Sequence, residues 1–536
     1  MKHLRTAFER QPNLHRFLCH LYQRIAEKRL NLVTGAGISI DVGVPSWFGL
    51  LDRLSERSEE LKVDIGFHRE NGLNPEYLGQ IIFHRIKNEP RSDVSSDLLE
   101  ATVNRDWSNA IHEAIYKDLD KNITEILGRH PYLNDLCELA KKLSLVINFN
   151  FDDILAEAMN FVSEKEKSLS QRPFTVVYHP PLLDRSDATT IYHVNGVLPR
   201  ENLKKRSPQL IFTEDSFADA LARSPGISSE YIFLRFVQNT MLLIGHSLND
   251  TSLKNYLRLN RDKCPANHHY MIYWLDKPDS LSAQQRNDLF EANLELYNLI
   301  TIFLTSPEIK EVLELLNKKE ERDFRDLIDD IVDEGCSFNY YIVGPVAAGK
   351  SSVLEQLRCF HTYEEWTRLP PKEMYLSFDK LDDNEKEKVD NFVYGELKEK
   401  NIRISKAGVG FHFMDRAPLD LYAFSNDDKE RKDKTKSIKS KVTRHQGFQR
   451  GEIIFVTAKG ETLVKRNLGR GRLPSKSGEE GYLEQQSGFL KDLYNPNIII
   501  NTDNMMPGEA ARKIARHVLL DEYSPIDLNK IMDKYS

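Results

Sequence analysis

The stretch GPVAAGKS at residues 344–351 constrains the fold of this chain more than any other part of its sequence. It matches the pattern G-x-x-x-x-G-K-[ST], with the apolar strand sequence FNYYIV before it and the helical sequence SVLEQLR after it. A glycine-containing loop in this context surrounds phosphate groups with backbone N–H groups and ends at a helix N-terminus that favours anions. The stretch therefore predicts a strand–loop–helix unit that binds a nucleotide.

The residues of this P-loop also predict how the nucleotide is held. Backbone groups from Gly344 to Gly349 are expected to surround its phosphates, and Lys350 is expected to reach the terminal phosphates. Ser351, followed by Ser352, is placed to bind the metal ion. The expected ligand is ATP or another nucleotide with Mg²⁺.

A second glycine loop, the N-terminal glycine loop, reads VTGAGIS at residues 33–39 and follows the apolar strand sequence RLNL. Gly35, Ala36 and Gly37 would let a pyrophosphate approach the backbone closely, as in dinucleotide-binding turns. A tight strand–helix turn without a ligand explains the same residues. The loop therefore needs support from elsewhere in the chain.

Three further strand ends carry polar residues or glycine. Because open α/β sheets bind ligands at the carboxyl ends of their parallel strands, these residues are expected to lie together beside the N-terminal glycine loop. They are Asn150 and Asp152 in NFNFDDIL, His193 and Asn195 in IYHVNG, and Gly245 and Ser247 in LLIGHS. Each could instead cap a strand, but four such strand ends in one chain indicate a binding site.

Apolar runs alternate with helical stretches along the chain, which predicts an α/β fold with largely parallel sheets. A Rossmann-like domain is expected over residues 1–307, a charged helical connector over 308–335, and a P-loop domain over 336–536. The apolar runs of the first domain lie in RLNLV before the glycine loop and at 143–150, 209–214, 240–247, 270–276 and 299–305.

Composition narrows the class of protein further. The chain has 536 residues, 40% of them apolar, and its formal net charge of −7 gives no reason to expect a nucleic-acid binder. Its five cysteines have no metal-ligand spacing, which fits a reducing cytoplasm. No apolar signal sequence and no run of about 18 apolar residues occurs, so we expect a cytoplasmic protein that does not contact a membrane.

With these motifs, residues 10–305 resemble the sirtuin superfamily, and more closely the zinc-free sirtuin-like proteins of bacterial antiphage systems. GAGIS…GVPSW is similar to the NAD-binding loop of that family, NFDDIL to its N-[YF]-D-x-L-[LI] motif, and GHSLND to its G-x-S-x-x-D motif. In the family the glycine loop holds the NAD phosphates and the asparagine contacts the nicotinamide ribose. The resemblance implies NAD-binding or catalytic roles for Gly35, Ala36, Gly37, Ser39, Pro45, Trp47, Asn150, Asp152, Gly245 and Ser247.

One motif departs from the family pattern. The family's catalytic histidine usually lies directly before a glycine, often in YHVHG, and acts as a base on the ribose. This chain has YHVNG, with Asn195 at that place and His193 two residues earlier. An amide does not take up a proton near neutral pH as an imidazole does. Three explanations stay open: His193 acts as the base, Asn195 is an introduced inactivating change, or the domain binds NAD without efficient turnover.

A second departure concerns zinc. Protein-deacetylating sirtuins resemble one another in a four-cysteine zinc module that follows the HG stretch. No cysteine lies between Gly196 and Gly245 in this chain, so that module is missing. The resemblance therefore favours hydrolysis of NAD⁺ to nicotinamide and ADP-ribose over deacetylation.

Residues 335–536 resemble, more loosely, the deoxynucleoside and thymidylate kinase family. The strand sequence GFHFMD ends in Asp415 and Arg416, which is similar to the D-R strand end of that family. Arg466, Arg470 and Arg472 are similar to its R-x-x-x-R-G-R lid, and YLEQQ is similar to the helix that follows. Guanidinium groups suit such a lid because they pair with phosphate oxygens. A solvated face is the alternative explanation for the three arginines.

Two domains of these kinds on one chain suggest an effector joined to a sensor. We expect an antiphage protein that hydrolyses NAD⁺ when its kinase-like domain senses a nucleotide or a phage-derived trigger, which halts phage growth together with the cell. Related effectors assemble as oligomers, so a homo-oligomer is expected. Two alternatives stay open: an active nucleotide kinase that is regulated by NAD or ADP-ribose at its sirtuin-like half, and a binding scaffold that consumes neither NAD nor ATP.

Overall fold

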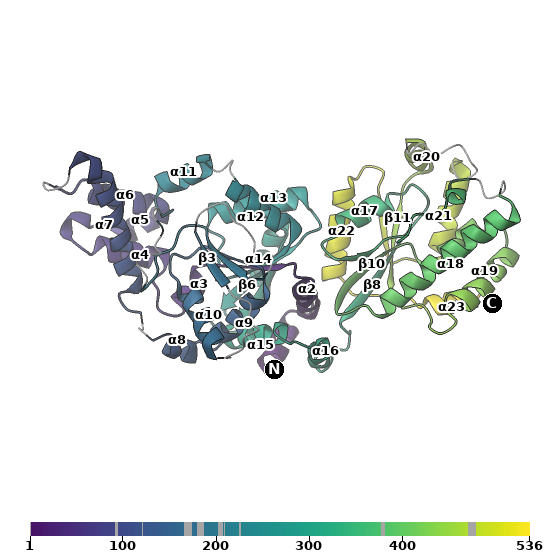
Figure 1. Ribbon diagram of the computed structural model, residues 1–536, viewed down its shortest axis with the longest axis horizontal. Coiled ribbons are helices and arrows are strands. Elements are labelled where there is room, and N and C mark those ends of the chain that lie inside the picture. Colours follow the sequence, from purple (N-terminus) through teal and green to yellow (C-terminus); the bar gives the residue numbers. More distant parts are fainter. Residues whose placement is uncertain are drawn as a thin grey trace. The chain divides into compact units, whose positions relative to one another are not determined.

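The computed structural model describes residues 2–91, 95–119, 122–165, 174–178, 187–201, 207, 210–223, 227–376, 381–469 and 479–536. The chain forms two compact units (Figure 1). The first comprises Met1–Leu14, Arg24–Arg261 and His268–Lys319, and the second comprises His15–Gln23, Asp262–Asn267 and Glu320–Ser536. Helices α2 (Leu14–Ala26) and α13 (Thr251–Lys263) therefore contribute residues to both units.

The first unit contains a seven-stranded sheet in which every pairing is parallel. Its strand order is β3-β4-β2-β1-β5-β6-β7, and its central strands are continuous buried runs because helices cover both faces (Figure 1). The strands are β1 (Leu30–Thr34), β2 (Leu145–Asn148), β3 (Phe174–Val177), β4 (Thr189–His193), β5 (Thr240–Ile244), β6 (His269–Leu275) and β7 (Leu299–Thr305).

Strand β1 lies at the centre of this sheet, with β2 on one side and β5 on the other. The chain crosses from one half of the sheet to the other at this point. Open parallel sheets bind ligands at such a crossing point, outside the carboxyl ends of the strands. The register pairs Thr34 with Asn148 and with Ile244, so the loops that follow these three strands begin at one level.

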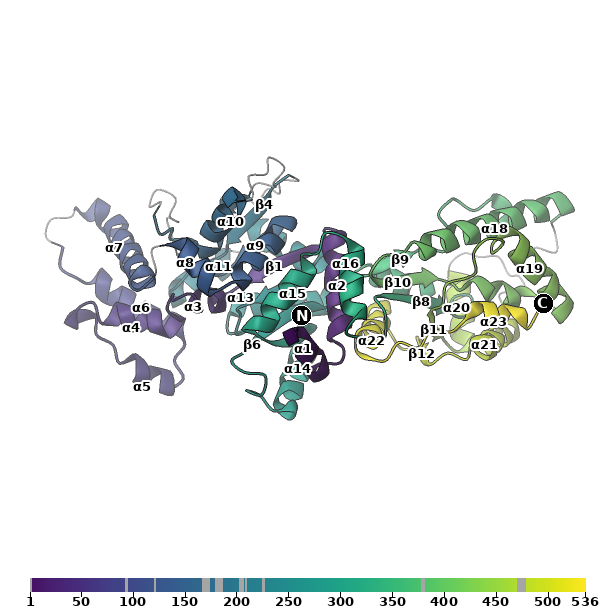
Figure 2. The same cartoon turned by 90° about the horizontal axis from the view of Figure 1, so that it is seen from below.

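Helices α4 to α7 contact one another and form a group that extends the first unit beyond its sheet (Figure 2). They are inserted between β1 and β2. Besides α2 and α13, the helices of this unit are α1 (Lys2–Arg10), α3 (Ala36–Ile40), α4 (Trp47–Ser55), α5 (Ile65–Glu70), α6 (Pro75–Lys87), α7 (Ser96–Tyr116), α8 (Ile123–Arg129), α9 (Tyr132–Lys142), α10 (Ile154–Lys165), α11 (Glu214–Arg223), α12 (Ile227–Gln238), α14 (Ala283–Tyr297) and α15 (Ser306–Leu316).

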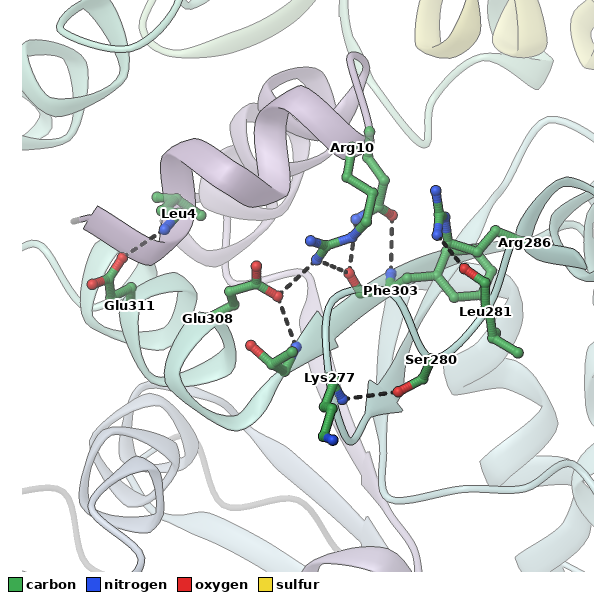
Figure 3. Close-up of polar contacts among 11 residues, drawn as sticks. Leu4, Arg10, Lys277, Ser280, Leu281, Arg286, Phe303, Glu308 and Glu311 are labelled. Atoms are coloured by element: carbon green, nitrogen blue, oxygen red, sulfur yellow. Dashed lines mark hydrogen bonds and ion pairs between the residues drawn. The ribbon is translucent and has the colours of Figure 1, made fainter. Parts of the chain in front are cut away.

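The N-terminal helix α1 is fixed to β7 and α15 by polar contacts (Figure 3). Arg10 donates from Nη2 to the carbonyl oxygen of Phe303 at 3.1 Å and to Glu308 Oε2 at 2.7 Å. Gln11 exchanges two hydrogen bonds with the backbone of Phe303. Glu308 is buried and also accepts from the N–H of Thr305 at 2.8 Å, so one carboxylate joins α1 to the start of α15.

The second unit contains a five-stranded parallel sheet of order β12-β11-β8-β10-β9. Strand β8 leads into the P-loop from the centre of this sheet, and Figure 1 shows α17 and α22 on one side of it and α18 on the other. The strands are β8 (Ser337–Val343), β9 (His361–Tyr363), β10 (Gly410–Asp415), β11 (Glu452–Thr457) and β12 (Ile498–Asn501). The helices are α16 (Glu321–Asp329), α17 (Lys350–Gln356), α18 (Asp383–Ser405), α19 (Asp428–Lys441), α20 (Gly460–Gly469), α21 (Glu480–Tyr494), α22 (Pro507–Leu520) and α23 (Leu528–Asp533).

The predicted α/β fold with parallel sheets is confirmed. One apolar run differs from expectation, because residues 210–213 of the run 209–214 have no strand structure. Phe212 is fully buried there among aromatic side chains, so the run is apolar because it closes the core beside a pocket. Residues 308–335 contain most of α15 and all of α16. Within the described ranges, no helix is long and apolar enough to span a membrane.

Candidate functional site

A small pocket lies at the carboxyl ends of β1 and β2 in the first unit. Its volume is about 40 Å³, which leaves room for only a few water molecules. It is lined by Ala36, Ser39, Val44, Pro45, Trp47, Leu50, Ile115, Phe149, Asn150, Phe151 and Asp152. Six of these residues are among the predicted site residues, namely Ala36, Ser39, Pro45, Trp47, Asn150 and Asp152.

The N-terminal glycine loop packs directly against the end of β5. The N–H of Gly37 donates to the carbonyl of Gly245 at 2.8 Å, and the N–H of Gly35 donates to the carbonyl of Ile244 at 3.0 Å. A Cβ atom on Gly35 would lie 2.6 Å from the carbonyl oxygen of Gly245, so a larger residue does not fit. Both N–H groups are bonded within the protein, and the two loop glycines therefore serve close packing. Ser247 is exposed and does not line the pocket.

The side-chain amide of Asn150 has an orientation that its neighbours fix. Its Nδ2 donates to the carbonyl oxygen of Gly35 at 3.0 Å and to Ser39 Oγ at 2.8 Å. A carbonyl oxygen can only accept, so the amide nitrogen must face Gly35, and both of its N–H groups are then used. The amide oxygen Oδ1 is the part of this side chain that can accept a hydrogen bond from a hydroxyl group in the pocket.

Ser39 connects Asn150 to Asp152. Because the Ser39 hydroxyl accepts from Asn150, its single proton is donated to the carboxylate of Asp152. The N–H of Ile154 also donates to Asp152 Oδ1, at 3.2 Å. Burial outweighs these bonds and raises the pKa of Asp152 to about 6, and the neighbouring Asp153 carboxylate adds to the rise.

His193 and Asn195 contact the backbone of the loop after β2 and do not line the pocket. His193 Nδ1 lies 2.9 Å from the carbonyl oxygen of Asn150, so Nδ1 carries the hydrogen and Nε2 is a bare acceptor. Burial lowers the pKa of His193 to about 4, and Nε2 has no hydrogen-bond partner among the described residues. Asn195 donates from Nδ2 to the carbonyl of Phe149 at 3.1 Å. His193 Nδ1 and Asn195 Nδ2 therefore hold this loop, while Nε2 of His193 is left as an acceptor.

An aromatic cluster beside the pocket joins two rings of the sequence motifs, Trp47 and Phe151, to two that no motif contains, Trp107 and Phe212. The ring of Trp47 packs on that of Phe212 at a centroid distance of 5.0 Å, and Phe212 packs on Trp107 at 5.5 Å and on Phe151 at 5.7 Å. The four rings come from separate segments, so no local pattern identifies them as neighbours. His246 packs against the N-terminal glycine loop, and burial lowers its pKa to about 4. Its place in GHSLND is the signal that could have identified it.

The P-loop of the second unit connects β8 to α17. A Cβ atom on Gly344 would lie 1.9 Å from the carbonyl oxygen of Val456, so glycine is required there. Lys350 begins α17, and its Nζ donates to the carbonyl oxygens of Gly344 and Pro345, both at 2.8 Å. Burial lowers the pKa of Lys350, and the charge of Arg416 adds to the effect.

Gly349 ends the P-loop in the left-handed region, with φ at 97°, and Ser351 and Ser352 follow in α17. Ser351 Oγ donates to Asp415 Oδ2 at 2.9 Å. The other carboxylate oxygen of Asp415 is buried, without a hydrogen-bond partner in the described part of the chain. A hydroxyl and a carboxylate are oxygen ligands of the kind that Mg²⁺ prefers, directly or through water. These residues therefore fit the Mg²⁺ that a nucleotide would bring.

Two more acidic residues lie near the P-loop without a motif in the sequence. Arg416, with φ at 68°, forms an ion pair with Glu365 at 2.5 Å. Asp420 is buried and accepts from the Tyr494 hydroxyl at 2.9 Å. Burial raises the pKa of Asp420, while the Arg416 charge opposes the rise. Glu365 follows a strand of only three residues, which is too short to stand out as an apolar run.

Arg466 is the one arginine of the predicted lid that the structure describes. Its guanidinium donates to Thr502 Oγ1 at 2.8 Å and to the Thr502 carbonyl at 2.7 Å, just after β12. Thr502 Oγ1 in turn lies 3.0 Å from the carbonyl oxygen of Ala348 in the P-loop, to which it donates. Arg470 and Arg472 lie outside the described residues.

A family model described as a SIR2-like domain matches residues 144–299. The predicted likeness to sirtuin-like domains is therefore confirmed for residues 144–299. NAD(+) hydrolase ThsA of Bacillus cereus (strain MSX-D12) is 23% identical over 313 residues, which cover 56% of this chain and 57% of that protein. The chain thus spans little more than half the length of this relative.

Solved structures similar to parts of the chain include a Sir2 homologue in complex with NAD, with a TM-score of 0.25 and 14% identity over 57% of this chain and 94% of that one. Deoxyadenosine kinase from M. mycoides with bound dATP has a TM-score of 0.27 and 16% identity, over 34% of this chain and 98% of its own. Shikimate kinase from Acinetobacter baumannii in complex with shikimate has a TM-score of 0.23 and 16% identity, over 38% of this chain and 99% of its own.

Proposed function

We propose that the first unit hydrolyses NAD⁺ to nicotinamide and ADP-ribose at the pocket that contains Ser39, Asn150 and Asp152. The observation that carries this proposal is the fixed amide of Asn150, which offers one oxygen to a hydroxyl group beside a buried carboxylate. A ribose supplies such hydroxyl groups. The similarity to the NAD(+) hydrolase ThsA supports the same reaction.

The pocket is partly open to solvent and has room for only a few water molecules, so we propose that its wall moves outward to admit the larger nicotinamide ribose. Residues 41–46, between α3 and α4, have no regular structure and include Val44 and Pro45 of the lining. This segment belongs to no strand, so it can shift without breaking a strand pairing. We therefore assign it the role of admitting the nicotinamide ribose.

The experiment that tests this proposal follows NAD⁺ by chromatography during incubation with the purified chain, with and without ATP or a phage lysate. From the parent we expect nicotinamide and ADP-ribose in equal amounts. Asn71→Ala, an exposed control outside the pocket lining, should give the same amounts as the parent. Asn150→Ala should release neither product. If Asn150→Ala hydrolyses NAD⁺ as fast as the parent, the assignment of the pocket is wrong.

The second unit is a candidate nucleotide-binding site, and the same geometry favours phosphoryl transfer as a second function. Lys350, the Ser351–Asp415 pair and the Arg416–Glu365 ion pair lie around the P-loop, where they would face the phosphates and an acceptor hydroxyl. Lys350→Ala should weaken nucleotide binding by about 1.5–3 kcal/mol, since a charge-assisted contact to phosphate is lost. Calorimetry with Lys432→Ala, an exposed lysine on α19, provides the matched control.

We further propose that the P-loop unit senses a nucleotide or a phage-derived trigger and controls NAD⁺ hydrolysis as an antiphage defence. An unrestrained NAD⁺ hydrolase would kill its host, so a control element is needed. A nucleotide that binds one state of the second unit better than another can bias that equilibrium. The expected homo-oligomer belongs to the same proposal, and analytical ultracentrifugation with and without nucleotide would measure it.

A further inference from the structure

NAD⁺ hydrolysis needs a group that accepts a proton from water. At the place of the family's catalytic histidine this chain has Asn195, with His193 two residues earlier. Asn195 is an amide that donates to the Phe149 carbonyl. His193 has its hydrogen on Nδ1, which faces the Asn150 carbonyl, and its bare acceptor Nε2 is buried. Neither lines the pocket. Of the described residues that do line it, Asp152 alone has a carboxyl, imidazole or amine group.

The chemistry of NAD⁺ also reduces the need for a histidine. Nicotinamide leaves as a neutral molecule from a positively charged ring, so the leaving group requires no acid. Positive charge then develops on C1′ and the ring oxygen of the ribose, and a carboxylate nearby stabilises such a transition state, as in glycoside hydrolysis. The attacking water must finally lose a proton. One carboxylate in the right place can meet both requirements.

We propose that Asp152 is the catalytic base of this site and that it stabilises the positive charge on the ribose. The inference rests on the proposed hydrolysis of NAD⁺ in the same pocket. It makes His193 and Asn195 positioning residues, which hold the backbone on either side of Asn150. It also explains how a chain with asparagine in place of the family histidine can still turn over NAD⁺.

The C1′–N bond breaks, and its electron pair goes to the nicotinamide nitrogen, which removes the positive charge of that ring. A lone pair of the water oxygen forms the new C1′–O bond, and one water proton passes to the Asp152 carboxylate. That proton is later released to solvent. NAD⁺ and water thus become nicotinamide, ADP-ribose and one proton, without oxidation or reduction.

The surroundings of Asp152 suit this role because they orient the carboxylate without neutralising it. Ser39 donates its hydroxyl proton to the carboxylate, and Ile154 donates its N–H to Oδ1. The titratable groups that act on it are Asp153, next in the chain, and Tyr116 at the end of α7. The Tyr116 hydroxyl donates to Asp153 Oδ1 at 3.1 Å, so no cation contacts the Asp152 carboxylate among these described neighbours.

The test compares the parent with Asp152→Asn and His193→Gln, and measures NAD⁺ affinity by calorimetry and kcat/KM as a function of pH. In Asp152→Asn we expect unchanged NAD⁺ affinity with kcat lowered by about 10²–10⁴-fold, the range for loss of a general base. The parent's kcat/KM should decrease at pH values below about 6, the pKa of Asp152, which gives the pH profile an acid limb. Any residual activity of Asp152→Asn should lack this acid limb. His193→Gln should keep the limb and lose far less activity.

The outcomes separate the inference from the proposed function. If the parent hydrolyses no NAD⁺ under any condition, the proposed function fails. If the parent is active while Asp152→Asn keeps its kcat, Asp152 is not the base. An acid limb near pH 4, the pKa of His193, together with loss of activity in His193→Gln, would assign the proton to His193 and overturn the inference. Loss of NAD⁺ affinity in Asp152→Asn would make Asp152 a binding residue only, which also overturns it.

Discussion

Asp152 is a buried acid, and its cost to stability can be measured independently of catalysis. Burial raises its pKa from the usual 3.8 to about 6 in the folded protein. The folded state therefore holds a proton more tightly than the unfolded chain does. The unfolding free energy should fall as the pH rises from about 4 to about 6, and stay at the lower value above that range.

Asp152→Asn removes this cost at neutral pH. The shift of about 2 pKa units corresponds to at most about 3 kcal/mol, so the variant should be more stable than the parent by up to that amount. Urea denaturation of both proteins measures the difference, with Asp288→Asn, an exposed acid on α14, as the control. A variant less stable than the parent at neutral pH would show that the carboxylate is stabilised by its neighbours rather than destabilised by burial.

The sequence identifies much of this pocket because its polar residues lie in short motifs at strand ends. Asn150 and Asp152 follow β2 directly, and the glycine loop follows β1, so their proximity follows from a parallel sheet. The hydrogen bond from Asn195 to the Phe149 carbonyl could not be predicted from the sequence, because it depends on how two loops pack. The same holds for Trp107, which reaches the pocket region from α7.

Helix α1 provides a prediction at the scale of elements. Arg10 and Glu308 form an ion pair in which the two side chains are only 8% and 2% exposed (Figure 3). Arg10→Ala leaves the Glu308 charge buried, with the Thr305 N–H as its remaining hydrogen-bond donor among the described residues, and should lower the unfolding free energy by about 3–5 kcal/mol. The double variant Arg10→Ala with Glu308→Gln should recover part of this loss, because no charge is left unpaired. Denaturation curves of the parent, Arg10→Ala and the double variant measure both effects, with Lys2→Ala as the exposed control. Equal losses in Arg10→Ala and the double variant would contradict this explanation.

The strands β1, β2, β5, β6, β7, β8 and β10 coincide with apolar runs of the sequence, because strands of parallel sheets that helices cover are buried on both faces. The apolar run 209–214 does not form a strand in its described residues, 210–214. It is equally apolar, yet Phe212 enters an aromatic cluster and residues 210–213 pair with no strand. Apolar runs of this length lack a period that separates a strand from a buried loop, so only the tertiary structure decides.

At the scale of the whole molecule, the proposed sensor and effector must affect each other's ligands. If a nucleotide at Lys350 and Ser351 changes the affinity for NAD⁺ by a given factor, NAD⁺ must change nucleotide affinity by the same factor. A coupling free energy of about 1–3 kcal/mol would give roughly 5–150-fold. Nucleotide titrations of Asp152→Asn, with and without NAD⁺, measure this factor without consuming NAD⁺. Identical nucleotide affinities in both conditions would mean that the chain carries two independent sites.

The decisive measurement is the fate of water oxygen during NAD⁺ consumption by the full chain. The purified protein would be incubated with NAD⁺ in water enriched in heavy oxygen, across a series of nucleotides, beside Asn150→Ala. We predict nicotinamide and ADP-ribose in equal amounts, with one heavy oxygen in each ADP-ribose, and no product from Asn150→Ala. No consumption of NAD⁺ by the parent under any of these conditions, or labelled ADP-ribose formed equally well by Asn150→Ala, would contradict hydrolysis at this pocket.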